Sequence, residues 1–217
     1  MDKLSTHYRT DSVERLDERI EEYLDKNYFD QLKNLDCSNP KLLVVFSGGN
    51  AVGKSTISAV IEDEFDAVVL ENDAVKRTLL QLKPDADRDE LNRLTWKYTM
   101  GLYPRLESLT ANGLLVRDGV IDWYFDRILP VFEQAGYELF IVGFDISRNK
   151  SIELIKKRGD TPTVKENRFY ELLEDHEIHI KRFREKYQPD ILLHDDDLFN
   201  HDIVIRALRQ KLASMQS

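Results

Sequence analysis

Short apolar runs alternate along the chain with longer segments whose apolar residues recur at helical spacing. The runs that predict buried strands are residues 42–46, 67–70, 114–116, 138–144 and 190–193. The segments that predict helices include residues 11–36, 88–112, 122–135, 149–158 and 163–187. Strands that alternate with helices in this way are typical of a parallel sheet covered on both faces. The pattern therefore predicts a three-layer α/β/α fold with a five-stranded parallel sheet.

The first predicted strand ends in a glycine-rich turn that reads GGNAVGKS. Gly48, four residues, Gly53, Lys54 and Ser55 have the GxxxxGK[ST] spacing of a phosphate-binding loop, and a helical segment follows. Glycines let backbone amides approach an anion closely, and a helix N-terminus attracts negative charge. Lys54 is expected to reach the β- and γ-phosphates, and Ser55 is expected to bind magnesium through its hydroxyl. The residues expected to hold the nucleotide phosphates are Gly48, Gly49, Asn50, Ala51, Val52, Gly53, Lys54, Ser55 and Thr56.

Acidic residues follow the predicted strands at the edge where the phosphate loop should lie, because parallel strands end at one edge. Asp73 comes just after the second strand and can accept the proton of a hydroxyl that attacks the γ-phosphate. Ordering of magnesium and capping of the next helix are the alternative roles for Asp73. Asp118, after the third strand, is favoured as the second magnesium ligand, and Asp145, after the fourth, competes for that role.

Phosphoryl transfer also requires positive charge around the moving group. Residues of about 159–187 are expected to form a helical lid, with Arg158 and Arg168 as the cations that approach the triphosphate. Ion pairs on a solvated helix are the alternative for these arginines. His176 and His179 lie three residues apart in the same segment, but no matching third ligand is evident, so we expect solvated histidines and no metal site.

Composition and charge narrow the class of protein further. The chain has 217 residues, a formal net charge of −9 and a single cysteine, Cys37, so an intrachain disulfide is impossible. The negative charge disfavours general nucleic-acid binding. No apolar run approaches the roughly 20 residues of a membrane span, and the polar N-terminus lacks the apolar core of a signal peptide. We therefore expect a cytoplasmic protein without membrane contact.

The order of these motifs resembles that of the P-loop kinases. The strand–GGNAVGKS–helix unit is followed by VVLENDAVKR, by LLVRDGVID and by an arginine-bearing segment, which looks most like the zeta-toxin and polynucleotide-kinase-like branch. That branch has an aspartate after the second strand and a basic residue within the next helical turn, as Asp73 has Lys76 and Arg77. The resemblance implies that ATP and Mg²⁺ are used to phosphorylate a hydroxyl of a small molecule, nucleotide sugar or nucleotide.

The resemblance also implies roles for individual residues. Asp73 would be the base, and Lys54, Arg158 and Arg168 would be the catalytic cations. The resemblance covers roughly residues 41–195. From the hydrophobic pattern we expect residues 41–217 to form the kinase domain and residues 1–40 to be a helical extension packed on the sheet. The extension could instead contact a protein partner, in which case a nucleotide-dependent regulatory ATPase is the alternative to a kinase.

Overall fold

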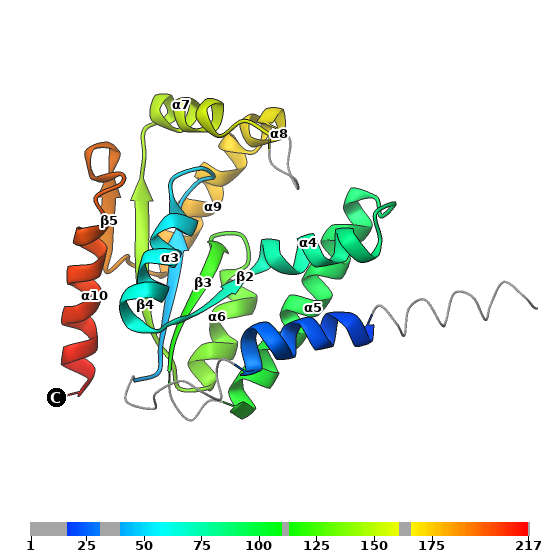
Figure 1. Ribbon diagram of the computed structural model, residues 1–217. Helices are drawn as coiled ribbons and strands as arrows, with labels where there is room; N and C mark the ends of the chain where they lie inside the picture. The colour runs from blue at the N-terminus through cyan, green and yellow to red at the C-terminus, as the bar shows by residue number, and fades with distance from the viewer. Residues whose placement is uncertain (1–16, 31–39, 110–112, 161–165, 217) are drawn as a thin grey trace, which may run out of the picture.

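The computed structural model describes residues 17–30, 40–109, 113–160 and 166–216. Within these ranges five strands alternate with helices, as the hydrophobic pattern predicts (Figure 1). The strands are β1 (Leu42–Ser47), β2 (Val68–Glu71), β3 (Leu114–Val120), β4 (Glu138–Asp145) and β5 (Ile191–His194). The main helices are α3 (Lys54–Phe65), α4 (Asn72–Leu82), α5 (Arg88–Leu109), α6 (Phe125–Gln134), α7 (Arg148–Arg158), α8 (Glu166–Glu171), α9 (Leu173–Lys186) and α10 (His201–Gln216).

The sheet is parallel, with the strand order β2-β3-β1-β4-β5. The central strand β1 is buried along its whole length, and its side chains alternate between two hydrophobic cores. Leu43 and Val45 pack in the core that contains residues of α5 and α6, whereas Val44 and Phe46 pack in the core that contains residues of α3 and α10. The predicted three-layer α/β/α fold is therefore confirmed, and the carboxyl ends of all five strands share one edge.

A helix precedes the sheet and belongs to the same core. It covers residues 17–30 of the described chain and includes a π-helical stretch, η1 (Asp25–Phe29). Ile20, Leu24 and Phe29 are buried in the core that also contains residues of α5. Lys97 of α5 donates a hydrogen bond of 2.9 Å to Asp17. The rest of the helix predicted over residues 11–36, together with Cys37, lies outside the described residues.

The third strand is longer than predicted. The register between β1 and β3 shifts from the pair Val45–Arg117 to the pair Phe46–Val120, which is a β-bulge at Asp118 and Gly119. The sequence indicates a turn at this point because Asp-Gly is a common turn pair. That expectation is wrong: Gly119 has a φ of +150° within the strand, so Asp118 lies in β3 and not after it.

The long helix predicted over residues 163–187 is divided. Within the described residues it consists of α8 and α9, which are separated at Leu172, while residues 163–165 lie outside the description. Together with α7, helix α8 and the start of α9 lie beyond the carboxyl edge of the sheet (Figure 1). Phe183, near the end of α9, is instead buried in the core that also contains residues of α6. None of the described helices is both long and apolar enough to span a bilayer.

Candidate active site

The glycine-rich turn joins β1 to α3 through a backbone that favours glycine. Gly48 has a φ of +154° and Gly53 a φ of +93°. A Cβ atom on Gly48 would lie 2.7 Å from the Cβ of Phe144, so a larger residue would displace the turn from β4.

α3 begins at Lys54, and the amides of Thr56 and Ile57 both donate to the carbonyl oxygen of Gly53 at 3.1 Å. The amides of Lys54 and Ser55 precede these bonds and are the ones that a helix N-terminus leaves without a helical partner. These amides and the positive end of the helix dipole are available to an anion.

Lys54 is held inside the turn. Its side chain is buried, and its Nζ donates to the carbonyl oxygen of Gly48 at 3.3 Å and to that of Gly49. Burial lowers the pKa of Lys54 to about 8, although the carboxylates of Asp122 and Asp118 oppose the shift. Near neutral pH the ammonium is therefore charged and close to the backbone amides that would surround a phosphate.

Asp122 holds the glycine-rich turn through hydrogen bonds. The sequence pattern alone did not identify it as a residue of the site. It is fully buried and accepts hydrogen bonds from Ser47 Oγ at 2.6 Å and from the backbone amide of Gly48 at 2.8 Å. Burial raises the pKa of Asp122, while these two hydrogen bonds and Lys54 favour its charged form. Asp122 therefore fixes the first part of the turn to the segment that follows β3.

Asp118 and Ser55 form a pair beside Lys54. Ser55 donates a hydrogen bond to Asp118, and burial raises the pKa of this carboxyl group. Glu71 is its neighbour in register on β2. Among the described residues no group of three or more His, Cys, Asp or Glu side chains could hold a metal ion alone. One hydroxyl and one carboxylate nevertheless fit Mg²⁺, which usually keeps several waters and takes its other oxygens from phosphates.

Asp145, the competing candidate, lies elsewhere on the sheet edge. It is exposed, and its carboxylate lies 3.4 Å from Arg184 and 3.5 Å from His194. The structure thus brings Asp118, and not Asp145, together with Ser55 of the phosphate loop. The pairing of Asp145 with two basic groups supports a structural role for it.

Asp73 lies in the first turn of α4, which follows β2. β3 lies between β2 and β1, the strand that leads to the phosphate loop. It is exposed, and its charge acts on Asp118 and on Lys76. The N-cap of α4 is Glu71, so Asp73 does not occupy the capping position that was its alternative role. Arg77 binds Glu71 through two contacts of 2.9 Å. An exposed carboxylate near Asp118 can meet a substrate that enters from solvent.

The two predicted lid arginines differ in their surroundings. Arg158, at the end of α7, is exposed, and its charge lowers the pKa of Lys54, which places it within electrostatic range of the phosphate loop. Its guanidinium lies over the ring of Phe169 with 5.2 Å to the centroid. Arg168, on α8, donates to Glu171 at 2.6 Å. Such an intrahelical ion pair is the alternative that the sequence left open for Arg168.

Comparison with solved structures identifies the fold. A chain of the PezAT chromosomal toxin–antitoxin system of Streptococcus pneumoniae matches with a TM-score of 0.61 and 14% identity, over 93% of this chain and 97% of that one. A candidate kinase from Chloroflexus aurantiacus gives a TM-score of 0.57 and 19% identity, with 81% and 98% covered. Shikimate kinase from Bacteroides thetaiotaomicron gives 0.51 and 9%, with 81% and 99% covered.

The chain has the fold of the P-loop kinases. The resemblance seen in the sequence is therefore confirmed at the level of the fold, while the branch within the P-loop kinases stays a prediction. No protein-family model matches the sequence, and no curated protein sequence matches it either. The spacing of the residues in the phosphate loop is therefore the main evidence in the sequence for this fold.

The surroundings of His176 differ from those predicted by the sequence. His176 was expected to be solvated, but only 5% of its surface is exposed. Its Nε2 lies 3.1 Å from the Nδ2 of Asn50, so α9 contacts the phosphate loop directly. The expectation failed because the charged residues of this segment suggest a solvated helix, whereas one face of the helix is covered. Burial, with Lys54 and His179 as smaller causes, lowers the pKa of His176 to about 4.

We expect His176 to make stability depend on pH. Its folded-state pKa of about 4 lies below its ordinary value of 6.5, so protonation favours the unfolded chain. The resulting loss of stability begins as the pH falls below 6.5 and is complete below 4, at up to about 3 kcal/mol. Urea unfolding at pH 7, 6, 5 and 4 measures the effect. His176→Gln should lose less stability than the wild type over this range. The control His201→Gln should show the same loss as the wild type. Equal dependence of the unfolding free energy on pH in all three proteins would contradict the role of His176.

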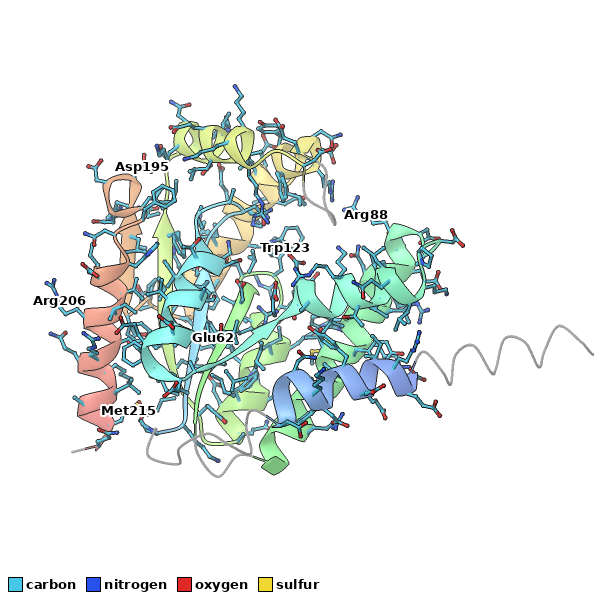
Figure 2. The ribbon with its side chains drawn as sticks, in the orientation of Figure 1. Glu62, Arg88, Trp123, Asp195, Arg206 and Met215 are labelled. Carbon is cyan, nitrogen blue, oxygen red and sulfur yellow. The ribbon has the colours of Figure 1, made fainter. Side chains whose placement is uncertain are left out.

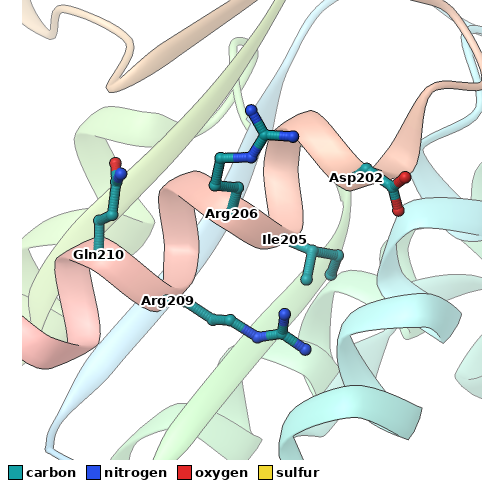
Figure 3. A pocket seen from close by; sticks show the side chains of 5 residues that line it. All are labelled: Asp202, Ile205, Arg206, Arg209 and Gln210. Atoms are coloured by element: carbon teal, nitrogen blue, oxygen red, sulfur yellow. The ribbon is translucent and has the colours of Figure 1, made fainter.

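A groove on α10 is separate from this site. The groove is lined by Asp202, Ile205, Arg206, Arg209 and Gln210, all from one helix (Figure 3). Arg209 is already engaged, because it donates to Glu64 at 2.6 Å and lies over the ring of Phe65. The groove shares no residue with the phosphate loop, and nothing connects it to the proposed chemistry.

Proposed function

We propose that the protein is an ATP-dependent phosphotransferase, which moves the γ-phosphate of Mg–ATP to a hydroxyl of a small-molecule, nucleotide-sugar or nucleotide acceptor. The observation that carries the proposal is the convergence of three groups at the carboxyl edge of the sheet. These are Lys54 inside the phosphate loop, the Ser55–Asp118 pair beside it, and Asp73 at the start of α4. A charged lysine, a magnesium-binding pair and an exposed carboxylate are the parts that in-line phosphoryl transfer requires.

Each group has a defined task in the proposed reaction. Lys54 and the amides of the loop bind the β- and γ-phosphates and stabilise the charge that develops on them. Mg²⁺, held by Ser55 and Asp118, would neutralise phosphate charge and orient the γ-phosphate. Asp73 accepts the proton of the acceptor hydroxyl while the new oxygen–phosphorus bond forms and the bond to ADP breaks. Arg158 lies within electrostatic range of the loop and would add positive charge from the lid.

Two further findings support this choice. Shikimate kinase, one of the similar structures, is a kinase by name, and it covers 81% of this chain. The alternative, a regulatory ATPase with the N-terminal helix as a docking surface, has less support in the described residues. Ile20, Leu24 and Phe29 of that helix are buried in the core of the domain and are not presented to a partner.

A transfer assay tests the proposed function. The purified protein is incubated with Mg²⁺ and γ-labelled ATP against a panel of sugars, sugar acids, nucleosides and nucleotide sugars, and labelled products are separated by chromatography. We expect label in at least one organic product in addition to any inorganic phosphate. Release of inorganic phosphate alone, stimulated by a protein partner and by none of the hydroxyl compounds, would instead indicate the regulatory ATPase.

A further inference from the structure

Three ring side chains form a cluster beside the phosphate loop, and the reaction proposed above uses none of them. Trp123 lies in the turn between β3 and α6, and His176 and His179 lie one helical turn apart on α9. The indole of Trp123 stacks on the ring of His179, with centroids 4.2 Å apart and an interplanar angle of 23°. It meets His176 edge-on with centroids 5.4 Å apart. We call these three residues the Trp–His cluster.

The cluster contains three buried ring nitrogens. Trp123 Nε1, His176 Nδ1 and His179 Nδ1 are shielded from solvent, and none has a hydrogen-bond partner among the described residues. His176 itself is 95% buried, since 5% of its surface is exposed. A buried polar atom without a partner costs about 1–3 kcal/mol, so three in one place are unusual in a native protein. A polar ligand that enters this space would supply the missing partners.

The hydrogen-bonding character of the cluster defines the ligand. Trp123 Nε1 can only donate. The Asn50 amide nitrogen donates to His176 Nε2, so the neutral His176 ring carries its hydrogen on Nδ1 and donates there as well. Two ring N–H groups therefore require oxygen acceptors. The cluster itself presents no cation, since burial and the charge of Lys54 keep His176 neutral near pH 7. A ligand with hydroxyl or carbonyl oxygens meets these requirements.

The position of the cluster relates it to the transfer reaction. His176 contacts Asn50 of the phosphate loop, and Trp123 directly follows Asp122, which binds the amide of Gly48. β2, which leads to Asp73, is paired with β3, which leads to Trp123. Figure 2 shows Trp123 between α9 and the start of α4. Asp73 belongs to the first turn of α4. The cluster is therefore joined to the phosphate loop, and Trp123 follows the strand next to the one that leads to Asp73.

We propose that the Trp–His cluster binds the phosphate acceptor through hydroxyl or carbonyl oxygens that accept hydrogen bonds from Trp123 and His176. This assignment rests on the proposed transferase function and adds the chemistry by which the acceptor is recognised. Trp123 forms one wall of the acceptor site, and the face of α9 that carries His176 and His179 forms another. Acceptor binding satisfies the buried ring nitrogens and turns a hydroxyl towards Asp73.

Fluorescence offers a direct test, because the chain has only two tryptophans, Trp96 and Trp123. Trp96 packs against Tyr124 with the two rings tilted by 43°, and in the Trp96→Phe variant Trp123 is the only remaining indole. This variant is titrated with a non-hydrolysable Mg–ATP analogue and then with gluconate, shikimate, UDP-glucose and a deproteinised bacterial metabolite extract. We expect a saturable change in Trp123 emission with at least one of these probes after the analogue has bound. A full change with the analogue alone, or no change with any probe, overturns the proposal.

A kinetic arm separates this proposal from the proposed function. With the acceptor that takes label in the transfer assay, Trp123→Phe removes one donor but keeps an aromatic ring, and its KM for the acceptor should rise about three- to tenfold. The KM for ATP should change by less than about twofold, and the matched control Trp96→Phe should leave both values near those of the wild type. Transfer with an unchanged acceptor KM in Trp123→Phe overturns the acceptor site alone. Probe-dependent emission without any transfer retains the site and overturns the transferase.

Discussion

Replacing Asp73 with asparagine is expected to lower the rate of phosphate transfer by about 10²–10⁴-fold, the usual contribution of a general base. Asparagine keeps the size of the side chain and its place in the first turn of α4 but cannot accept the proton of the acceptor hydroxyl. Because Asp73 lies outside the phosphate loop, the affinity for Mg–ATP should change by less than about threefold. Steady-state transfer kinetics and calorimetric titration with an ATP analogue measure the two effects.

The chain offers a matched control for this substitution. Asp145 is also an exposed aspartate at the carboxyl edge of the sheet, but it lies close to Arg184 and His194 and not to Ser55. Asp145→Asn should therefore retain most of the transfer activity. Full activity in Asp73→Asn would remove Asp73 as the base, and an equal loss in both variants would show that the effect is not specific to Asp73.

Replacing Lys54 with methionine is expected to reduce kcat by about 10²–10³-fold, as the loss of one preorganised charge-stabilising donor does in other enzymes. Methionine fills a similar volume inside the turn but brings neither a positive charge nor a donor to the phosphates. Nucleotide affinity should fall as well, because Lys54 is the buried cation of the phosphate loop. Transfer kinetics and calorimetry with the ATP analogue measure both effects.

Thermal unfolding distinguishes a catalytic loss from a folding defect in the Lys54 variant. Burial lowers the pKa of Lys54 to about 8, so the folded protein holds this charge at a cost, and its removal should not lower the melting temperature by more than a few degrees. Lys150→Met is the control, since Lys150 is paired with Glu153 at 2.9 Å on α7. An active Lys54→Met protein with normal ATP affinity would contradict both the proposed function and the site.

The local parts of this site could be predicted from the sequence. An apolar run, a GxxxxGK[ST] spacing and a helical segment follow one another, so the phosphate loop, Lys54 and Ser55 were placed without any tertiary information. The alternation of strands and helices predicted the three layers for the same reason, because each element carries its own periodicity. Sequence alone did not fix the strand order β2-β3-β1-β4-β5, which depends on pairing between distant segments.

The parts that were missed depend on contacts between residues far apart in the chain. Asp122 bonds to residues more than 70 positions away, and nothing in its own neighbourhood distinguishes it from a turn residue. The bond between Asn50 and His176 joins positions 126 residues apart. His176 lies among acidic and basic residues, and such a pattern does not reveal which face of the helix is covered. The bulge at Asp118 was read as a turn because the Asp-Gly pair suits both.

The turn after β3 has a consequence for how two substrates would affect each other. Asp122 holds the first glycine of the nucleotide loop, and the very next residue, Trp123, forms a wall of the proposed acceptor site. A single peptide bond therefore connects the supports of both ligands, and a shift that one ligand imposes on this segment reaches the other ligand's support. Thermodynamic linkage requires this influence to be mutual: if ATP tightens acceptor binding by a given factor, the acceptor tightens ATP binding by the same factor.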